Sequence, residues 1–249
     1  MSLTRREFHE GLLGSLLTWS LLDTICGSEA LAAPVRMATS EWLKRVNGLA
    51  QDLRGEKLSQ VEWQNTCEEL FSQVDLPQLL KAIDFEKLTS EAKLADRGAS
   101  HLKLSLDKVE GVPEKLVFGR QIFGLKEGRS VIPHGHDNMT SAFLILGGSF
   151  RGRHFDRIET QDEHFLIKPT IDKTFESGGC STVSDDRDNV HWFEALEEGS
   201  YILNIHVLGL VPGVPATGRV YLDPQGEQLA DGLIRARKIG YAECNKLYG

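Results

Sequence analysis

The stretch SVIPHGHDNMTSAFLILGG, residues 130–148, decides the fold of this chain. It has the pattern of a strand that carries His134 and His136, followed by an apolar run that ends in two glycines. Side chains alternate between the faces of a strand, so histidines at i and i+2 point the same way, about 6.5 Å apart. His191 supplies a third imidazole further along the chain. Buried polar side chains need partners, and we therefore predict that His134, His136 and His191 bind one transition-metal ion.

The residues around this pair resemble the first sequence motif of the cupin superfamily. Gly128 precedes His134-Gly-His136 at the cupin distance, and a polar position follows the pair. Many cupins have a glutamate at that polar position, whereas this chain has Thr140 or Ser141. The resemblance covers about residues 116–221. It implies a mainly β fold with a single cupin jelly-roll barrel.

The missing carboxylate makes the ligand set similar to that of the thiol dioxygenase branch of the cupins, in which three neutral histidines hold iron. This resemblance implies Fe²⁺ as the metal, with a small thiol or other small anionic substrate and O₂ as partners. Imidazole also suits Zn²⁺ and Ni²⁺, and Mn²⁺ is a further alternative. A cupin hydrolase or isomerase that uses one of these metals, and a cupin that binds a metal or ligand without catalysis, therefore stay open as functions.

The next strand, residues 150–157, offers candidates for the substrate side of the site. Alternation places His154 on one face and Arg153 on the other, so one of them points into the barrel. We predict catalytic roles for Arg153 and His154, because an arginine would bind a carboxylate in a bidentate pair and a histidine is a candidate fourth ligand. By the same alternation we expect Thr140 to face the metal. We also consider Asn138 as a hydrogen-bond partner of a ligand histidine.

The amino terminus predicts export. Thr4-Arg5-Arg6-Glu7-Phe8 resembles the twin-arginine signal, and the uncharged stretch 11–22 follows it. Ala30-Leu31-Ala32 offers a small-residue cleavage site, so residues 1–32 are predicted to be a signal peptide. We therefore expect a periplasmic or secreted protein without stable membrane insertion after cleavage.

The composition is that of a globular protein with an acidic surface. The formal net charge of the 249 residues is −8, which argues against nucleic acid as a partner. Helical spacing of apolar residues between 38 and 94 predicts a helical extension, residues 33–98, that covers the barrel or forms a homodimer contact. Short strands separated by turn residues predict the barrel over 99–222. A polar tail, residues 223–249, is expected to end in a short helix over 233–247.

Overall fold

The computed structural model describes residues 36–106, 109–113 and 115–249. The predicted signal peptide lies outside the described residues. The expected helical extension holds four helices, α2 (Thr39–Arg54), α3 (Gln60–Ser72), α4 (Leu76–Ala82) and α5 (Phe85–Ser90). None of the helices in the described part of the chain is long and apolar enough to cross a membrane.

Local sequence explains where these helices begin. Ser59 caps α3 in a capping box, in which its side chain accepts a hydrogen bond from the backbone N–H of Glu62 and the Glu62 carboxylate accepts one from the backbone N–H of Ser59. Asp75 caps α4, and Pro77 stands in the first turn, where its missing N–H costs nothing. The predicted apolar faces of α2 and α3 are buried, with Trp42 and Trp63 almost fully inaccessible.

The rest of the chain is mainly β. A short strand, β1 (Ser100–Leu102), precedes the strands of the barrel. These are β2 (Gly119–Leu125), β3 (Ser130–Asp137), β4 (Met139–Gly147), β5 (Phe150–Thr160), β6 (His164–Phe175), β7 (Cys180–Val183), β8 (Val190–Ala195), β9 (Ser200–Leu208), β10 (Thr217–Gln228) and β11 (Ile234–Lys238). The helix α6 (Tyr241–Tyr248) ends the chain as given.

The strand order identifies a jelly roll. One sheet has the order β1-β2-β9-β4-β7, and the other contains β3, β8, β5 and β6 as successive neighbours. If β2 to β9 are lettered B to I, the sheets read B-I-D-G and C-H-E-F, so the chain passes repeatedly from one sheet to the other. The predicted fold class, a single cupin-type jelly-roll barrel behind a helical extension, is confirmed.

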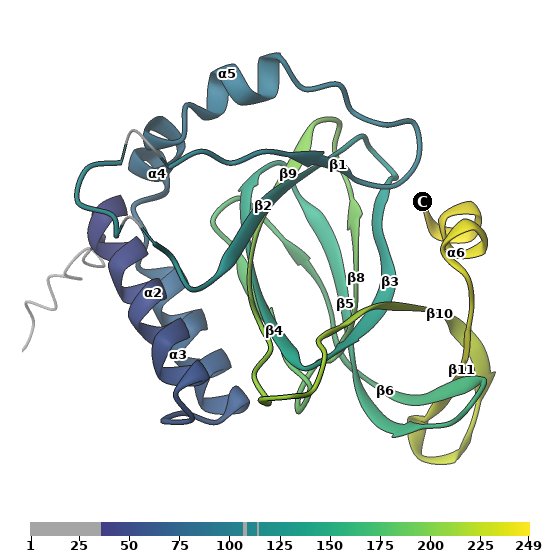
Figure 1. The fold of residues 1–249 in the computed structure, drawn as a ribbon. Coiled ribbons are helices and arrows are strands. Elements are labelled where there is room, and N and C mark those ends of the chain that lie inside the picture. Colours follow the sequence, from purple (N-terminus) through teal and green to yellow (C-terminus); the bar gives the residue numbers. More distant parts are fainter. Residues whose placement is uncertain (1–35, 107–108, 114) are drawn as a thin grey trace, which may run out of the picture. The chain divides into compact units, whose positions relative to one another are not determined.

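Two buried layers lie on the two sides of the first sheet. The helices α2 and α3 pack on its outer face (Figure 1), where Trp42 and Trp63 join the apolar cluster that includes Leu144 and Leu203. The inner face meets the second sheet across a separate cluster that contains Phe123, Phe143, Phe193 and Ile202. The first layer consists mainly of apolar side chains, whereas the second also receives the predicted metal ligands.

The last strands differ from the predicted polar tail. β10 pairs with β3 and then with β11, and β11 pairs with β6, so that the second sheet closes into a six-stranded ring. The helix expected over 233–247 is shorter, because residues 234–238 form β11. Pro224 and Gly226 interrupt the strand pattern of β10, and this strand was therefore not predicted from the sequence. The ladder shifts register between Asp223 and Glu227, and a Cβ at position 226 would clash with the carbonyl oxygen of Arg235.

Candidate metal centre

Strand register places three histidines in a row across the second sheet. His134 on β3 is paired with His191 on β8, and His191 is paired with His154 on β5. Paired residues of neighbouring strands point to the same face, which here is the barrel interior. His136 joins this face because it follows His134 by two residues on β3. The predicted alternation within β3 and the pairing of β3 with β8 therefore bring the imidazoles to one place.

The structure brings together the three predicted ligands. One ring nitrogen from each of His134, His136 and His191 lies within 4.8 Å of the other two, and all three residues are buried. The ring centres of His134 and His191 are 4.2 Å apart, and those of His134 and His136 are 4.7 Å apart. This group could hold a metal ion.

Backbone carbonyls fix the orientation of two of these rings. Nδ1 of His134 lies 2.7 Å from the carbonyl oxygen of Ile132, and Nδ1 of His191 lies 3.1 Å from that of Asn189. A carbonyl can only accept, so each Nδ1 carries the proton and each Nε2 keeps a free lone pair. Metal-bound histidines usually have such a partner for the second nitrogen. Two of the three imidazoles are therefore held in the tautomer that a metal needs.

The third imidazole and the protonation of the group also fit a metal. Nδ1 of His136 is buried without a hydrogen-bond partner among the described residues, which is costly unless an ion or water satisfies it. Burial holds the pKa values of His134 and His136 well below their usual range and lowers the pKa of His191 to about 4. All three are neutral near pH 7, which is the form that binds metals.

A cavity of about 280 Å³ opens from the three histidines. Its wall is largely apolar, with Phe123, Phe143 and Leu208 among its members. None of the described residues that line it is an aspartate or a glutamate. Arg219 is its cationic residue, and its guanidinium carbon lies 5.5 Å from the centre of the Phe123 ring. The cavity therefore combines neutral imidazoles, apolar walls and one positive charge.

Sequence reasoning missed Arg219. The pairing of β10 with β3 brings it to the site, because Val220 is opposite Gly135 and Tyr221 is opposite His134. This pairing joins residues more than eighty positions apart, and no local pattern announces it. The short apolar run Val220-Tyr221-Leu222 was the available signal, since such a run is consistent with a strand but does not specify its partner.

Arg153, predicted as catalytic, does not reach this cavity. It lies on the opposite face of β5, where its guanidinium stacks 4.0 Å from the centre of the Trp192 ring. Both terminal nitrogens donate to one oxygen of Glu194, at 3.0 and 3.1 Å. Of the two faces considered for this strand, the one that carries His154 points inward, and Arg153 therefore points outward.

His154 is inside the barrel but does not line the cavity. Its ring centre is 6.4 Å from that of His191, and the group of three ligand nitrogens does not include it. It packs against Phe193 and lies 3.2 Å, through Nε2, from the hydroxyl of Ser181. These contacts describe a hydrogen-bonded histidine in the core. Its predicted catalytic role has no geometric support here.

The expectation for Thr140 is wrong, and Ser141 takes its place. Met139, Ser141 and Phe143 line the cavity, whereas Thr140 points to the other side of β4, toward the helical layer. The alternation counted from His136 fails at Asn138, whose φ of 60° is left-handed. The chain leaves the second sheet there and enters the first, so the parity of β3 does not continue into β4.

Asn138 has a different role from the one considered. Its side chain holds the segment 209–216, which follows β9 and leads to Arg219. Nδ2 donates to the carbonyl oxygens of Val211 and Val214 at 3.3 and 2.6 Å, and Oδ1 accepts from the backbone N–H of Val211 at 2.6 Å. Leu208, which directly precedes this segment, and Ala216, which ends it, line the cavity. We call residues 209–216 the strap.

The strand β9 contributes two further polar residues to the cavity wall. His206 and Asn204 both line it, and Nδ1 of His206 lies 3.1 Å from Oδ1 of Asn204. Gln121 of β2 donates to the same oxygen at 3.3 Å. The ring of His206 stands at the cavity wall, and His206 is opposite Ser141 in the register of β4 and β9.

The comparisons with known proteins found similarity to solved structures, and the other two comparisons found none. No protein-family model and no curated protein matches the chain. An 11S globulin from Wrightia tinctoria is 14% identical over 53% of this chain and 29% of its own, with a TM-score of 0.37. An oxalate decarboxylase variant from Bacillus subtilis is 18% identical over 49% of this chain and 29% of its own, with a TM-score of 0.34.

A third similar structure has no assigned activity. It is an uncharacterized protein with a double-stranded β-helix domain from Klebsiella pneumoniae, 10% identical over 49% of this chain and 82% of its own, with a TM-score of 0.35. The match covers less than a third of the globulin and of the decarboxylase. The fold assignment rests on the strand order given above, and the site on its own geometry.

Proposed function

We propose that this protein is an exported, metal-dependent cupin that works as a mononuclear non-haem iron dioxygenase-like enzyme on a small thiol or other small anionic molecule. The observation that carries the proposal is the combination of three neutral histidines and Arg219 around one cavity, with no carboxylate among the described residues that line it. A substrate with an anionic donor would supply the negative charge that the protein's own ligand set lacks.

The residues of the chain would divide the work. His134, His136 and His191 would hold the iron, which supplies the redox chemistry with dioxygen when it is bound. Arg219 would bind the anionic group of the substrate and fix its position. The apolar wall, including Phe123 and Phe143, would keep water away from the reacting atoms. The cavity volume of about 280 Å³ is just below the usual range of ligand pockets, about 300–1,000 Å³, which favours a small substrate.

Elemental analysis and oxygen uptake test this function. Protein purified with its metal should contain iron near stoichiometry. The iron form should consume oxygen only when a suitable member of a panel of thiols, phenols and small keto acids is present. If the iron form is inert with the whole panel and the zinc form hydrolyses a substrate, the hydrolase function replaces the proposed one.

Arg219 provides a sharper test within the active protein. Arg219→Gln removes the charge and should raise KM at least about tenfold for an anionic substrate, because charge-assisted hydrogen bonds contribute about 1.5–3 kcal/mol. The loss should be smaller with an uncharged analogue of the same shape. Arg219→Lys retains the charge and should recover part of the affinity. Equal KM values for the wild type and Arg219→Gln would remove the proposed role.

Export is tested separately from catalysis. Arg5→Lys combined with Arg6→Lys should leave an uncleaved precursor in the cytoplasm, because the twin arginines are the recognition element. Cell fractionation and the N-terminal sequence of the product measure this. Normal arrival of the double variant in the periplasm would show that the signal was misread, without bearing on the metal site.

A further inference from the structure

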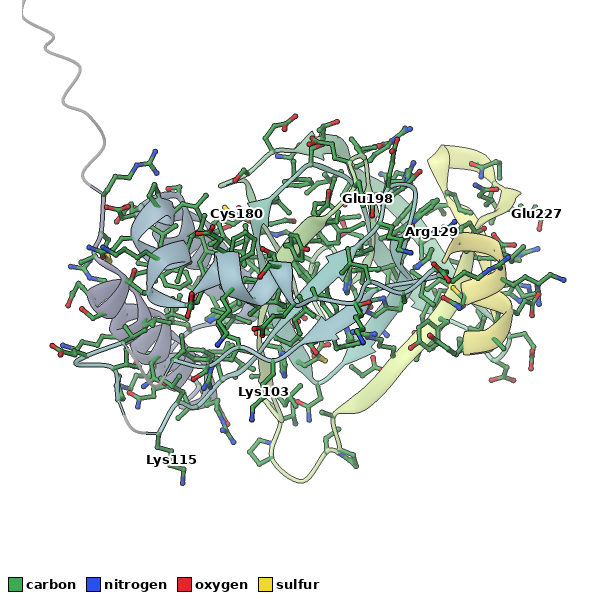
Figure 2. All side chains as sticks on the ribbon, turned by 90° about the horizontal axis from the view of Figure 1, so that it is seen from above. Lys103, Lys115, Arg129, Cys180, Glu198 and Glu227 are labelled. Atoms are coloured by element: carbon green, nitrogen blue, oxygen red, sulfur yellow. The ribbon has the colours of Figure 1, made fainter. Side chains whose placement is uncertain are left out.

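The segment 184–189 connects the two sheets, since it runs from the end of β7 to the start of β8. Figure 2 shows Cys180, the first residue of β7, on the side of the barrel that the helices cover, and its thiol lies 3.7 Å from the carbonyl oxygen of Glu68 on α3. Asn189 ends the segment and is only 1% exposed. Asparagine is mostly exposed in folded proteins, so a buried one in a connection between strands needs a reason.

The side-chain amide of Asn189 joins this connection to the backbone of a candidate metal ligand. Its Nδ2 donates to the carbonyl oxygen of His136 at 2.8 Å and to that of Ser184 at 3.0 Å. Carbonyl oxygens only accept, so these two contacts fix which end of the amide is the nitrogen. The amide therefore bridges β3 and the connection before β8, with both of its N–H groups used.

This bridge lies where the ladder between β3 and β8 has ended. The last pair of that ladder is His134 with His191, and Asn189 would be opposite His136 if the strands continued in the same register. On the other side of β3, the ladder with β10 shifts register at His136 as well. Ladder pairing positions the backbone of His134 and His191. The backbone of His136 depends instead on a side chain.

Gly135, between the two histidines of β3, leaves room for the amide. A Cβ at position 135 would lie 2.7 Å from Oδ1 of Asn189, which is closer than such atoms approach in real proteins. This Oδ1 is buried and has no hydrogen-bond partner among the described residues. An unpartnered buried acceptor costs free energy, so packing of Oδ1 on the glycine is not what holds the amide. The hydrogen bonds from Nδ2 hold it.

We propose that Asn189 is a positioning residue of the metal centre, which sets the place of His136 through the backbone carbonyl of that ligand. The carbonyls of Ile132 and Asn189 orient the rings of His134 and His191, and the amide of Asn189 would fix the third ligand at its backbone. Asn189 would touch neither the metal nor the substrate. The inference rests on the three-histidine site of the proposed function, but it does not depend on iron or on chemistry with dioxygen.

Titration of metal-free protein with cobalt(II) tests this role without substrate. The visible absorption bands of bound cobalt depend on the geometry of its ligands, and the titration also gives the affinity. Asn189→Ala should weaken cobalt binding about 10- to 100-fold, the usual loss when a group that orients a metal ligand is removed, and should change the absorption bands. Asn189→Ser leaves a smaller void and should change both in the same direction, because its hydroxyl cannot donate to two carbonyls. Both variants are measured on the folded fraction from gel filtration.

Gly135→Ala displaces the amide by a second route. Its Cβ would push Asn189 away from the carbonyl of His136, so this variant should also bind cobalt more weakly and change the absorption bands. In the double variant, Gly135→Ala with Asn189→Ala, the amide is already absent. Its affinity should therefore be close to that of Asn189→Ala and well above the product of the two single losses. Losses that multiply would overturn the proposal, because glycine and amide would then act separately.

Asn47→Ala is the matched control in the helical layer. Asn47 of α2 is also buried, and its Oδ1 accepts from the backbone N–H of Val117 at 2.9 Å. This variant should keep the cobalt affinity and spectrum of the wild type even where its stability falls. Wild-type affinity and spectrum in Asn189→Ala, or an equal loss in Asn47→Ala, would overturn the proposal and leave the metal site in place.

The same titration separates this inference from the proposed function. If the wild type binds no cobalt, the metal site and the role of Asn189 fail together. If cobalt binding responds to Asn189→Ala as expected while the iron form takes up no oxygen, the dioxygenase-like function fails and the role of Asn189 is supported.

Discussion

The two sides of β4 face two buried layers of different character. Thr140, Ala142 and Leu144 point to the helical layer, where they meet an apolar cluster built with α2 and α3. Ser141 and Phe143 point into the barrel, where the wall also carries His134, His136 and His191. Both layers contain apolar core clusters, and the inner one also holds the candidate metal site. A one-residue step along a strand is therefore enough to move a side chain from the structural layer to the candidate site.

The largest expected effect is the loss of metal from the barrel interior. His134→Ala, His136→Ala or His191→Ala should each reduce bound metal far below one ion per chain, because each removes one of three ligands. Metal content of the purified protein, measured by elemental analysis, checks this. The triple substitution should bind none.

His154 is the matched control for this prediction. It is as deeply buried as the three ligands and lies in register with His191, but its nitrogens are outside the ligand group. His154→Leu should therefore keep metal near stoichiometry in the fraction that folds. Full metal in the triple-alanine protein, or loss of metal in His154→Leu alone, would move the site elsewhere in the barrel.

Glutamate substitutions on the two faces of β4 test directly which face points into the barrel. Thr140→Glu buries a carboxylate in the apolar helical layer without a partner, and should lower the free energy of unfolding by about 3 kcal/mol or more. Ser141→Glu instead places the carboxylate beside neutral imidazoles and Arg219. It should retain metal and suppress substrate-dependent oxygen uptake, because the new carboxylate competes with the anionic substrate.

Urea unfolding followed by circular dichroism, with metal content measured on the same samples, distinguishes the two variants. Thr140→Ser is the mild control for the outer position, and Ser141→Gln supplies the size of glutamate without its charge. If Thr140→Glu changes oxygen uptake while it leaves stability intact, the assignment of faces along β4 is reversed.

Asn138 lies where the chain passes from β3 of the second sheet to β4 of the first, and its replacement should have an intermediate effect. Asn138→Ala removes three hydrogen bonds to the strap and leaves a residue with a Cβ at a φ of 60°. We expect a loss of about 1–3 kcal/mol in the free energy of unfolding. Faster hydrogen exchange should be confined to residues 209–216 and their neighbours.

Asn138→Gly distinguishes the loss of the hydrogen bonds to the strap from the backbone strain at position 138. It relieves the backbone strain at φ 60° but also lacks the side chain that binds Val211 and Val214. If the strap depends on the hydrogen bonds, the glycine variant should show the same fast exchange as the alanine variant. Exchange at the wild-type rate in both variants would show that the strap is held by other contacts.

The features that sequence could predict depend on contacts near in the chain. The helices follow from apolar spacing and from caps such as Ser59, and the pairing of His134 with His136 follows from alternation within one strand. Arg219 depends on the pairing of β10 with β3, which no local pattern specifies. Thr140 was misplaced because Asn138 interrupts the alternation. Arg153 was included because alternation gives two faces and does not say which one points inward.

The smallest expected effect belongs to the helical layer. Ser59→Ala removes the capping box of α3, which should cost about 1 kcal/mol of stability, the usual value for the loss of such a cap. Ser59→Asp retains an N-cap acceptor and should recover most of this loss. Metal content and oxygen uptake should be the same in both variants as in the wild type, because α3 contacts the face of β4 that points away from the histidines. A change in metal content with Ser59→Ala would mean that the two layers are coupled, through the hydrogen bonds that join Gln60 at the start of α3 to Asp185, which also accepts from the backbone N–H of Asn138.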